Sequence, residues 1–185
     1  MLHFDIGWRQ LEDISQELGA TNKQVKFALS RALRRTEATL RRMSSKGLAR
    51  VLQLRSVSAL NKRLRSIKLR KIGLDGGDTV GLWYGINPMP VSNFKGTPKD
   101  GERGAWFRDY YFEGGFVGRS KFKGRKTIFK RTTKAPLPIE EQLIKINDQA
   151  VVYLEDEVFE QVEKIFWQHF RRDLQSRVKF KLGAY

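Results

Sequence analysis

The hydrophobic positions at the start of the chain recur with helical spacing. Apolar side chains fall three or four residues apart over residues 8–18, and Gly19 follows where such a helix would end. A second, longer helix is predicted from Thr21 or Asn22, either of which can cap it, to about Leu52. Its apolar line consists of Val25, Leu29, Ala32, Leu33, Thr36, Leu40 and Met43. Both segments are therefore expected to pack as amphipathic helices.

The middle of the chain has the composition of β-structure. Val, Leu, Trp and Tyr concentrate from residue 79 onward, and glycines and prolines interrupt them at short intervals. Pro88 and Pro90 restrict the residues after them to an edge strand or an extended arm, so residues 88–104 are predicted to form a mobile loop. The predicted strands are 2–6, 79–86, 110–117, 127–131 and 142–146.

The end of the chain predicts one long helix. Asp148 can cap a helix from Gln149 to about Val178. Its acidic residues come early and its basic residues come late, which is the order that the helix dipole favours. A wide apolar stripe along this helix indicates that it packs along its length. A shorter helix is expected earlier in the chain, over residues 56–64.

These elements together predict a single α+β domain over residues 1–185. In this fold, basic N-terminal helices and a long C-terminal helix pack around one mostly antiparallel β-sheet. The helical basic part covers residues 8–72, the β part covers residues 79–146 and includes the loop 88–104, and the C-terminal helix covers residues 148–180.

Positive charge is segregated along the chain. The sequence carries 36 Lys and Arg against 20 Asp and Glu, for a formal net charge of +16. Residues 22–73 hold 16 of those cations and one acid, Glu37, and so carry +15 of the total. A cationic row of this kind suits the phosphates of a nucleic acid or an acidic protein surface, and the sequence leaves both open. The candidate interface or phosphate-facing residues are Arg34, Arg35, Arg41, Arg42, Arg63, Arg65, Lys68, Arg70 and Lys71.

Residue types that carry catalysis or bind metals are sparse. The chain has no cysteine, and neither His3 nor His169 has a second histidine or a carboxylate at ligand spacing, so both are interpreted as packing residues. The stretch 118–127 differs from a phosphate-binding loop in its glycine spacing and precedes a strand, which favours a basic hairpin turn. The acidic residues within 155–163 are explained as charge compensation at a helix start. We therefore expect no enzymatic activity, no metal and no cofactor.

The sequence does not indicate a segment that enters a membrane. Residues 1–7 lack the basic start and apolar run of a signal peptide, and no stretch approaches about 18 apolar residues. A soluble intracellular product without membrane contact is expected.

Five stretches are informative through the order in which they occur. They are the basic helix Val25-Lys-Phe-Ala-Leu-Ser-Arg-Ala-Leu-Arg-Arg, then Gly115-Phe-Val-Gly118 before a basic hairpin, Ile128-Phe-Lys-Arg131, Leu137-Pro-Ile139, and the terminal helix over 151–178 with its basic end. This order resembles the minor tail protein Z family of tailed phages and prophages, the tail-completion class. The match spans most of residues 22–181.

The resemblance implies a structural component of the virion tail or neck, made in the host cytoplasm, that finishes the tail and makes it competent for joining to the DNA-filled head. The resemblance implies that copies of the chain assemble into a ring, which is expected to be a hexamer, and that the ring contacts other tail or neck proteins. Non-specific contact with phage DNA is left open. The alternative is a stand-alone, non-specific nucleic-acid-binding protein, because the cationic residues alone do not separate the two functions.

Overall fold

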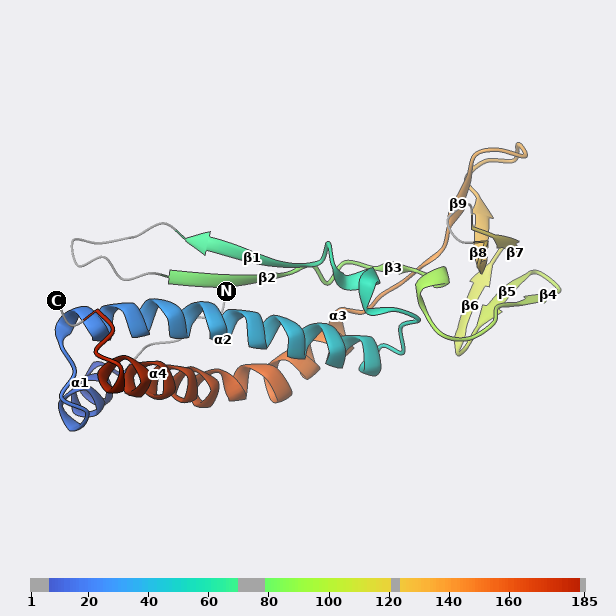
Figure 1. Ribbon diagram of the computed structural model, residues 1–185. Helices are drawn as coiled ribbons and strands as arrows, with labels where there is room; N and C mark the ends of the chain where they lie inside the picture. Colours follow the sequence, from blue (N-terminus) through green and yellow to red (C-terminus); the bar gives the residue numbers. More distant parts are fainter. Residues whose placement is uncertain (1–6, 70–78, 121–123, 184–185) are drawn as a thin grey trace. The chain divides into compact units, whose positions relative to one another are not determined.

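The structure, a computed structural model, describes residues 7–69, 79–120 and 124–183 (Figure 1). Its contacts divide the chain into two compact units. Unit 1 comprises Met1–Ser45, Lys62–Tyr84 and Leu154–Tyr185, and unit 2 comprises Lys46–Asn61 and Gly85–Tyr153. The sequence predicts one domain, whereas these contacts group around two separate centres. The strand predicted over residues 2–6 lies outside the described residues.

The two predicted N-terminal helices are confirmed. α1 spans Trp8–Glu17 and α2 spans Asn22–Val51. Gly19 follows α1 with φ +61°, a left-handed backbone conformation that favours glycine. Thr21 caps α2, because the backbone N–H of Gln24 donates to Thr21 Oγ1 (3.3 Å) while the Thr21 N–H donates to Gln24 Oε1 (3.0 Å). This reciprocal pair satisfies two backbone donors and fixes where α2 begins.

The C-terminal helix has the predicted extent but not one uniform hydrogen-bond pattern. It runs as α3 (Asn147–Tyr153), a π-helical turn η3 (Leu154–Val158), a 3₁₀ turn η4 (Phe159–Gln161) and α4 (Val162–Lys179). α3 belongs to unit 2, and the remainder belongs to unit 1. Val158 and Val162 flank η4 and are both buried, so the apolar side continues through the irregular turns.

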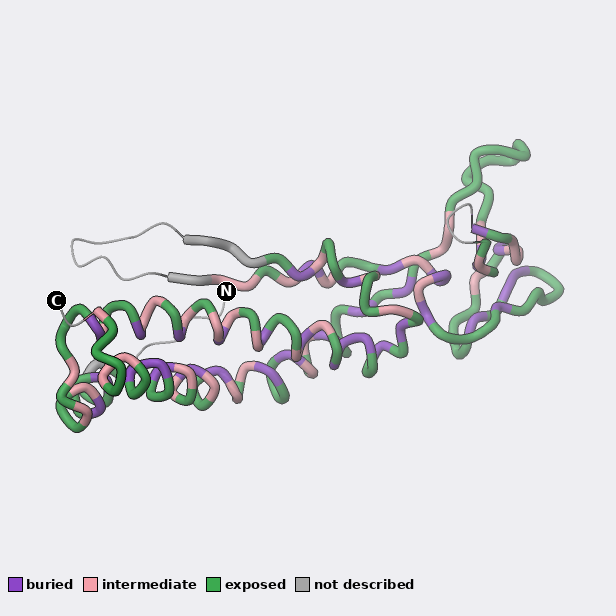
Figure 2. The backbone as a smooth tube through the Cα atoms, viewed as in Figure 1, coloured by how far each residue is buried: buried purple, intermediate pink, exposed green. Residues whose placement is uncertain are grey.

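The core of unit 1 forms where α2 and α4 lie side by side (Figures 1 and 2). α2 contributes the small side chains of Ala28 and Ala32, and α4 contributes Phe166, Phe170 and Leu174. All five have no exposed surface, and α1 completes the cluster with two further apolar side chains. The alanines allow the aromatic rings of α4 to approach the α2 backbone, so the packing depends on size complementarity between the helices.

A hairpin in unit 1 corrects the predicted helical part over residues 8–72. β1 (Leu64–Leu69) pairs antiparallel with β2 (Thr79–Tyr84). The short helix predicted over 56–64 is reduced to a 3₁₀ turn, η1 (Val57–Leu60), capped by Ser56. The strand forms because β2 supplies antiparallel partners for the backbone hydrogen bonds of residues 64–69.

Unit 2 contains three small antiparallel sheets. The first pairs β3 (Met89–Pro90) with β10 (Leu143–Ile144). The second consists of β4 (Lys99–Gly101), β5 (Gly104–Phe107) and β6 (Tyr110–Glu113). The third consists of β7 (Gly115–Arg119), β8 (Lys126–Arg131) and β9 (Ile139–Glu141). The α+β class is confirmed, but the described strands form four small sheets, the hairpin of unit 1 included, where one sheet is predicted. One cause is Gly114 (φ +69°), which divides the strand predicted over 110–117 into β6 and β7.

Residues 88–104, predicted to form a mobile loop, are only partly packed into unit 2, since residues 95–97 and 99–103 are exposed. The segment forms β3, the 3₁₀ turn η2 (Val91–Asn93) and β4. Met89, Val91 and Phe94 are each no more than 2% exposed. Residues 89–94 pack because proline is compatible with the short edge pairing that β3 makes with β10, and the apolar residues around the prolines fill the core.

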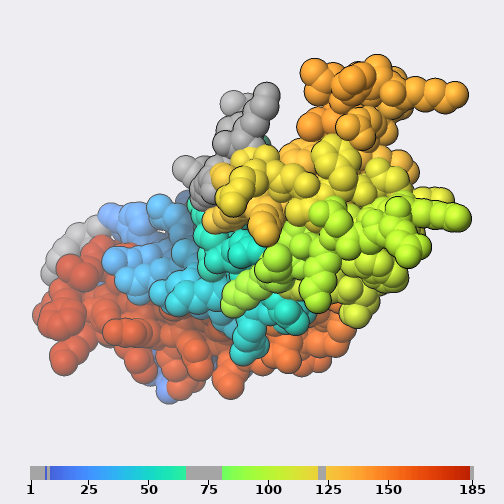
Figure 3. Space-filling model, turned by 90° about the vertical axis from the view of Figure 1, so that its right-hand side faces the viewer, coloured from blue at the N-terminus to red at the C-terminus, as the bar shows by residue number. Residues whose placement is uncertain are grey.

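The segment between β8 and β9 projects from unit 2 (Figure 3). Residues 132–138 are all exposed, and Leu137 is 69% exposed.

Candidate anion-binding site

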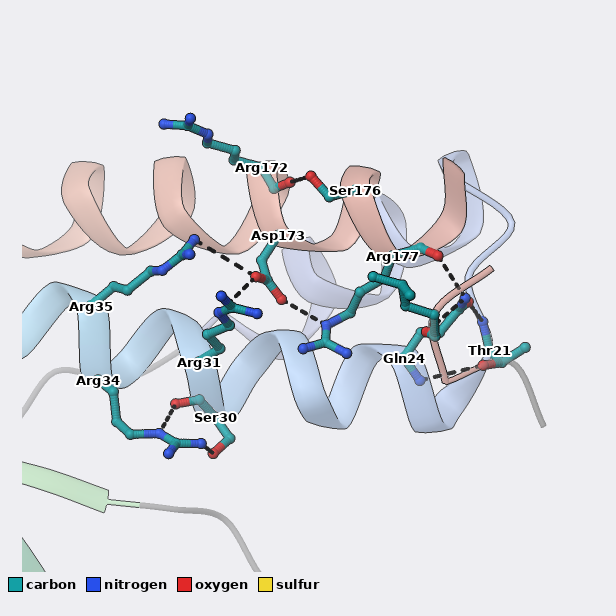
Figure 4. A network of polar contacts seen from close by, with 11 residues as sticks. Thr21, Gln24, Ser30, Arg31, Arg34, Arg35, Arg172, Asp173, Ser176 and Arg177 are labelled. Carbon is teal, nitrogen blue, oxygen red and sulfur yellow. Dashed lines mark hydrogen bonds and ion pairs between the residues drawn. The ribbon is translucent and has the colours of Figure 1, made fainter. Parts of the chain in front are cut away.

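α2 contains two pairs of adjacent arginines, Arg34 with Arg35 and Arg41 with Arg42, and the two members of each pair lie on different sides of the helix. Adjacent helical residues are about 100° apart around the axis, so one member of each pair can face α4 while the other does not. Arg35 and Arg42 line a pocket shared with α4. Arg34 points the other way in Figure 4, and its guanidinium donates to the Ser30 carbonyl (3.2 Å) and to Ser30 Oγ (3.1 Å). Arg41 is exposed and does not line the pocket.

The other predicted cations whose side chains the structure describes do not line this pocket. Arg63 is half-buried, and burial lowers the pKa of its guanidinium from the ordinary value. Arg65 is exposed on β1. Lys68 is placed only by its backbone in β1, and Arg70 and Lys71 lie outside the described residues. The structure therefore brings two of the nine predicted residues, Arg35 and Arg42, into one site.

The pocket between α2 and α4 is a shallow depression of about 580 Å³. Its lining contains four arginines and one carboxylate, with hydroxyl groups and an imidazole beside them. The lining residues are Arg31, Arg35, Ala38, Thr39, Arg42, His169, Arg172, Asp173 and Ser176. We call this surface the arginine pocket.

A buried carboxylate organises the arginine pocket (Figure 4). Asp173 is 6% exposed, and its two oxygens form ion pairs with three guanidinium groups, of which Arg177 also donates a hydrogen bond. Its Oδ1 lies 3.3 Å from Arg31 Nε and 3.7 Å from Arg35 Nη1, and its Oδ2 lies 2.7 Å from Arg177 Nε. Each contact uses one nitrogen of a guanidinium that carries five N–H donors. Arg31 and Arg35 are thus held in place with most of their donors unused by Asp173.

His169 lies at the edge of the pocket, with its Nε2 atom 3.2 Å from Thr39 Oγ1. Burial lowers the pKa of His169 below its ordinary value, and the charges of Arg35 and Arg172 lower it further. The imidazole is therefore neutral near neutral pH. Both histidines are predicted from the sequence to be packing residues. His169 is instead half-buried in the lining of the pocket, and His3 lies outside the described residues.

The lowered pKa of His169 predicts an acid-sensitive contribution to stability. A folded protein that resists protonating this ring loses stability as the pH falls through about 6.5, the unfolded value, towards the folded pKa. We expect the unfolding free energy of His169→Gln to fall less between pH 7 and pH 5 than that of the wild type. Urea unfolding at both pH values measures the difference, with His3→Gln as the control. An equal pH dependence in all three proteins would contradict the assignment.

Other charged clusters do not form sites in the part of the chain that the structure describes. No group of three His, Asp or Glu side chains there is arranged to hold a metal ion. The acidic residues within 155–163 are exposed. The stretch 118–127 joins two antiparallel strands, with Arg119 opposite Lys126, which confirms the hairpin and places no helix after it. None of the described helices is long and apolar enough to span a bilayer.

Unit 2 carries a surface of a different kind. Trp106 and Tyr111 are each more than 40% exposed, and we call them the aromatic surface. Trp106 on β5 lies opposite Tyr111 on β6, with ring centroids 4.7 Å apart. The opposite face of β5 buries Phe107, which is 1% exposed. The sheet therefore has one packed face and one face where large rings meet solvent.

Comparison of the chain with protein-family models, with curated proteins and with solved structures finds no match. The binding properties of the chain are therefore inferred from its own residues.

Proposed function

We propose that this protein is a structural subunit of a phage virion, of the tail-completion or neck type, that finishes the tail and makes it competent to join the head. Support comes first from the order of motifs that resembles the minor tail protein Z family. The observation that carries the proposal is that the chain presents two exposed surfaces of different chemistry, the arginine pocket on unit 1 and the aromatic surface on unit 2. A subunit that joins other components needs more than one binding surface.

The charge of the chain favours assembly over a solitary existence. A formal +16 on 185 residues repels itself, and this repulsion is relieved when acidic neighbours or nucleic acid screen it. Acidic components of the tail or neck, or the DNA that passes through them, supply this screening, whereas further copies of the same chain add positive charge.

The aromatic surface is assigned to contact with neighbouring subunits of the tail or neck. Trp and Tyr are the residues most often found to dominate the binding energy of protein interfaces. Truncating one such anchor costs about 2 kcal/mol or more of binding free energy. The rings of Trp106 and Tyr111 also contact each other, so their removal is expected to act on one continuous patch.

The double variant Trp106→Ala with Tyr111→Ala tests this assignment. We expect it to fold normally but to lower the yield of infectious particles by about tenfold or more, with heads and unjoined tails accumulating, because two exposed anchors are removed together. Plaque titre and negative-stain electron microscopy of lysates measure the effect. Trp83→Ala is the matched control, since Trp83 is 45% exposed and Trp106 is 47% exposed. Equal titres for the double variant and the wild type would remove the aromatic surface from the proposal.

A stand-alone nucleic-acid-binding protein is the second candidate, favoured by the arginine pocket. Deleting the gene from the phage or prophage that encodes it separates the two functions. The tail-completion role predicts DNA-filled heads beside unjoined tails, restored by supplying the protein in trans. The alternative predicts complete particles, an outcome that would overturn the proposal.

A further inference from the structure

Positive charge in the arginine pocket exceeds what the protein itself neutralises. Four guanidinium groups and one carboxylate line the depression, which leaves a net charge of three positive units when His169 is neutral. Asp173 is also shared with Arg177, so its compensation of Arg31 and Arg35 is partial. Arg42 and Arg172 have no acidic partner among the described residues. A concave surface of this kind attracts an anion from outside the chain.

The pocket is also organised in advance. Asp173 holds the heads of Arg31 and Arg35, so less side-chain entropy is lost when they bind an anion. Thr39 and Ser176 place hydroxyl groups in the same lining. Guanidinium groups present planar forks of donors that match the oxygens of a phosphate or a carboxylate.

The spacing of the cations favours a repeating anion. Arg31, Arg35 and Arg42 lie on one helix, separated along its axis by about 6 Å and about 10 Å at a rise of about 1.5 Å per residue. Arg172 faces the same depression from α4. A single side-chain carboxylate occupies one guanidinium fork, whereas a nucleic-acid strand offers a phosphate for about every 3.4 Å of axis. Several guanidinium groups along one depression are therefore better matched to the sugar-phosphate backbone of a nucleic acid.

We infer that the arginine pocket between α2 and α4 binds backbone phosphates of DNA without reading base sequence, with Arg31, Arg35, Arg42 and Arg172 as the contacting residues. Asp173 is a positioning residue, because it orients two of the arginines and is itself buried. This site goes beyond the tail-completion role and does not depend on it. Its test uses the purified chain, so the two can fail separately.

The experiment compares two pairs of arginines on a labelled duplex of arbitrary sequence. Arg42→Ala with Arg172→Ala removes two pocket cations that do not pair with Asp173, and Arg34→Ala with Arg41→Ala removes two exposed cations outside the pocket. Fluorescence anisotropy is measured from about 50 to 200 mM salt. We expect the pocket variant to bind about tenfold or more weakly and to lower the salt slope by about 1.8, at about 0.9 for each phosphate that is no longer neutralised. We expect less than half that change in slope for the control.

Two further arms identify the ligand. Inorganic phosphate, added at matched ionic strength, is expected not to displace the duplex, and the resonances of the His169 ring are expected to shift when the duplex binds. Binding of inorganic phosphate without binding of DNA would overturn the inference. So would tighter binding of poly-glutamate than of the duplex, or equal reductions of affinity in the two arginine pairs. Circular dichroism of each variant confirms that the helices are intact.

Discussion

Truncation of Phe166 to alanine is expected to lower the unfolding free energy by about 3–5 kcal/mol. Its ring has no exposed surface and stacks on Phe170, with centroids 6.1 Å apart and planes 10° apart. It lies in one buried cluster with Ala28 and Ala32 of α2, whose methyl groups cannot extend into the space that the ring leaves. The variant therefore combines a loss of apolar burial with a cavity that closes poorly.

Phe159→Ala is the matched control for this prediction. Phe159 is half-buried and meets Tyr84 edge-on at 5.9 Å, so part of its surface already contacts water in the folded state. Its truncation is expected to cost about half as much or less, since the loss scales with the apolar area returned to water. Urea unfolding followed by circular dichroism measures both variants. Equal losses would show that Phe166 does not occupy the centre of the core.

The sequence alone does not distinguish these two phenylalanines. Both lie on the apolar side of the predicted C-terminal helix, and periodicity would assign them the same burial. The difference arises from tertiary packing, because Phe166 belongs to the buried cluster that includes the alanines of α2 while Phe159 lies in the irregular turn η4. Helical spacing identifies the side of a helix that packs, but it does not identify which part of that side reaches the centre of a core.

Local signals predicted the helices well and the strands less well. α1 and α2 follow from spacing and caps that lie within a few residues of each other, such as Thr21 with Gln24. β1 was missed because its cations resemble the end of a basic helical segment, and the strand is stabilised by a partner that lies beyond residue 78. β3 was missed because prolines usually indicate a loop, whereas a two-residue edge pairing accepts one.

The residues of the candidate site that were predicted from the sequence all come from α2. Arg35 and Arg42 are visible as members of a basic helix, but Arg172 and Asp173 come from α4, more than a hundred residues later. One sequence signal was available for the carboxylate. Asp173 falls three residues after Phe170, on the side of α4 that carries the core, where an acid requires cationic partners. A cationic helix elsewhere in the same chain is the natural source of those partners.

Asp173→Ala is expected to lower the unfolding free energy by about 3 kcal/mol, near the lower end of the range for breaking a buried ion pair. The loss arises mainly at Arg177, whose side chain is 15% exposed and would remain charged without its 2.7 Å contact. Arg31 and Arg35 contribute less, since their side chains are 53% and 41% exposed and can turn to solvent. Asp173→Asn retains one oxygen acceptor and the side-chain volume, so a smaller loss is expected.

Salt separates the two parts of the Asp173 effect. Mutual repulsion among Arg31, Arg35 and their neighbours is screened as ionic strength rises, whereas the cost of leaving Arg177 buried and unpaired is not. We therefore expect raised salt to restore part of the stability of Asp173→Ala but not all of it.

Arg171→Ala breaks the exposed pair with Glu17 and serves as the control, with an expected loss of about 0–1 kcal/mol. Urea unfolding at low and high salt gives all of these values. Equal losses of unfolding free energy for Asp173→Ala and Arg171→Ala would mean that Asp173 is not a buried anchor. Full recovery of the stability of Asp173→Ala in high salt would mean that Asp173 only offsets surface charge.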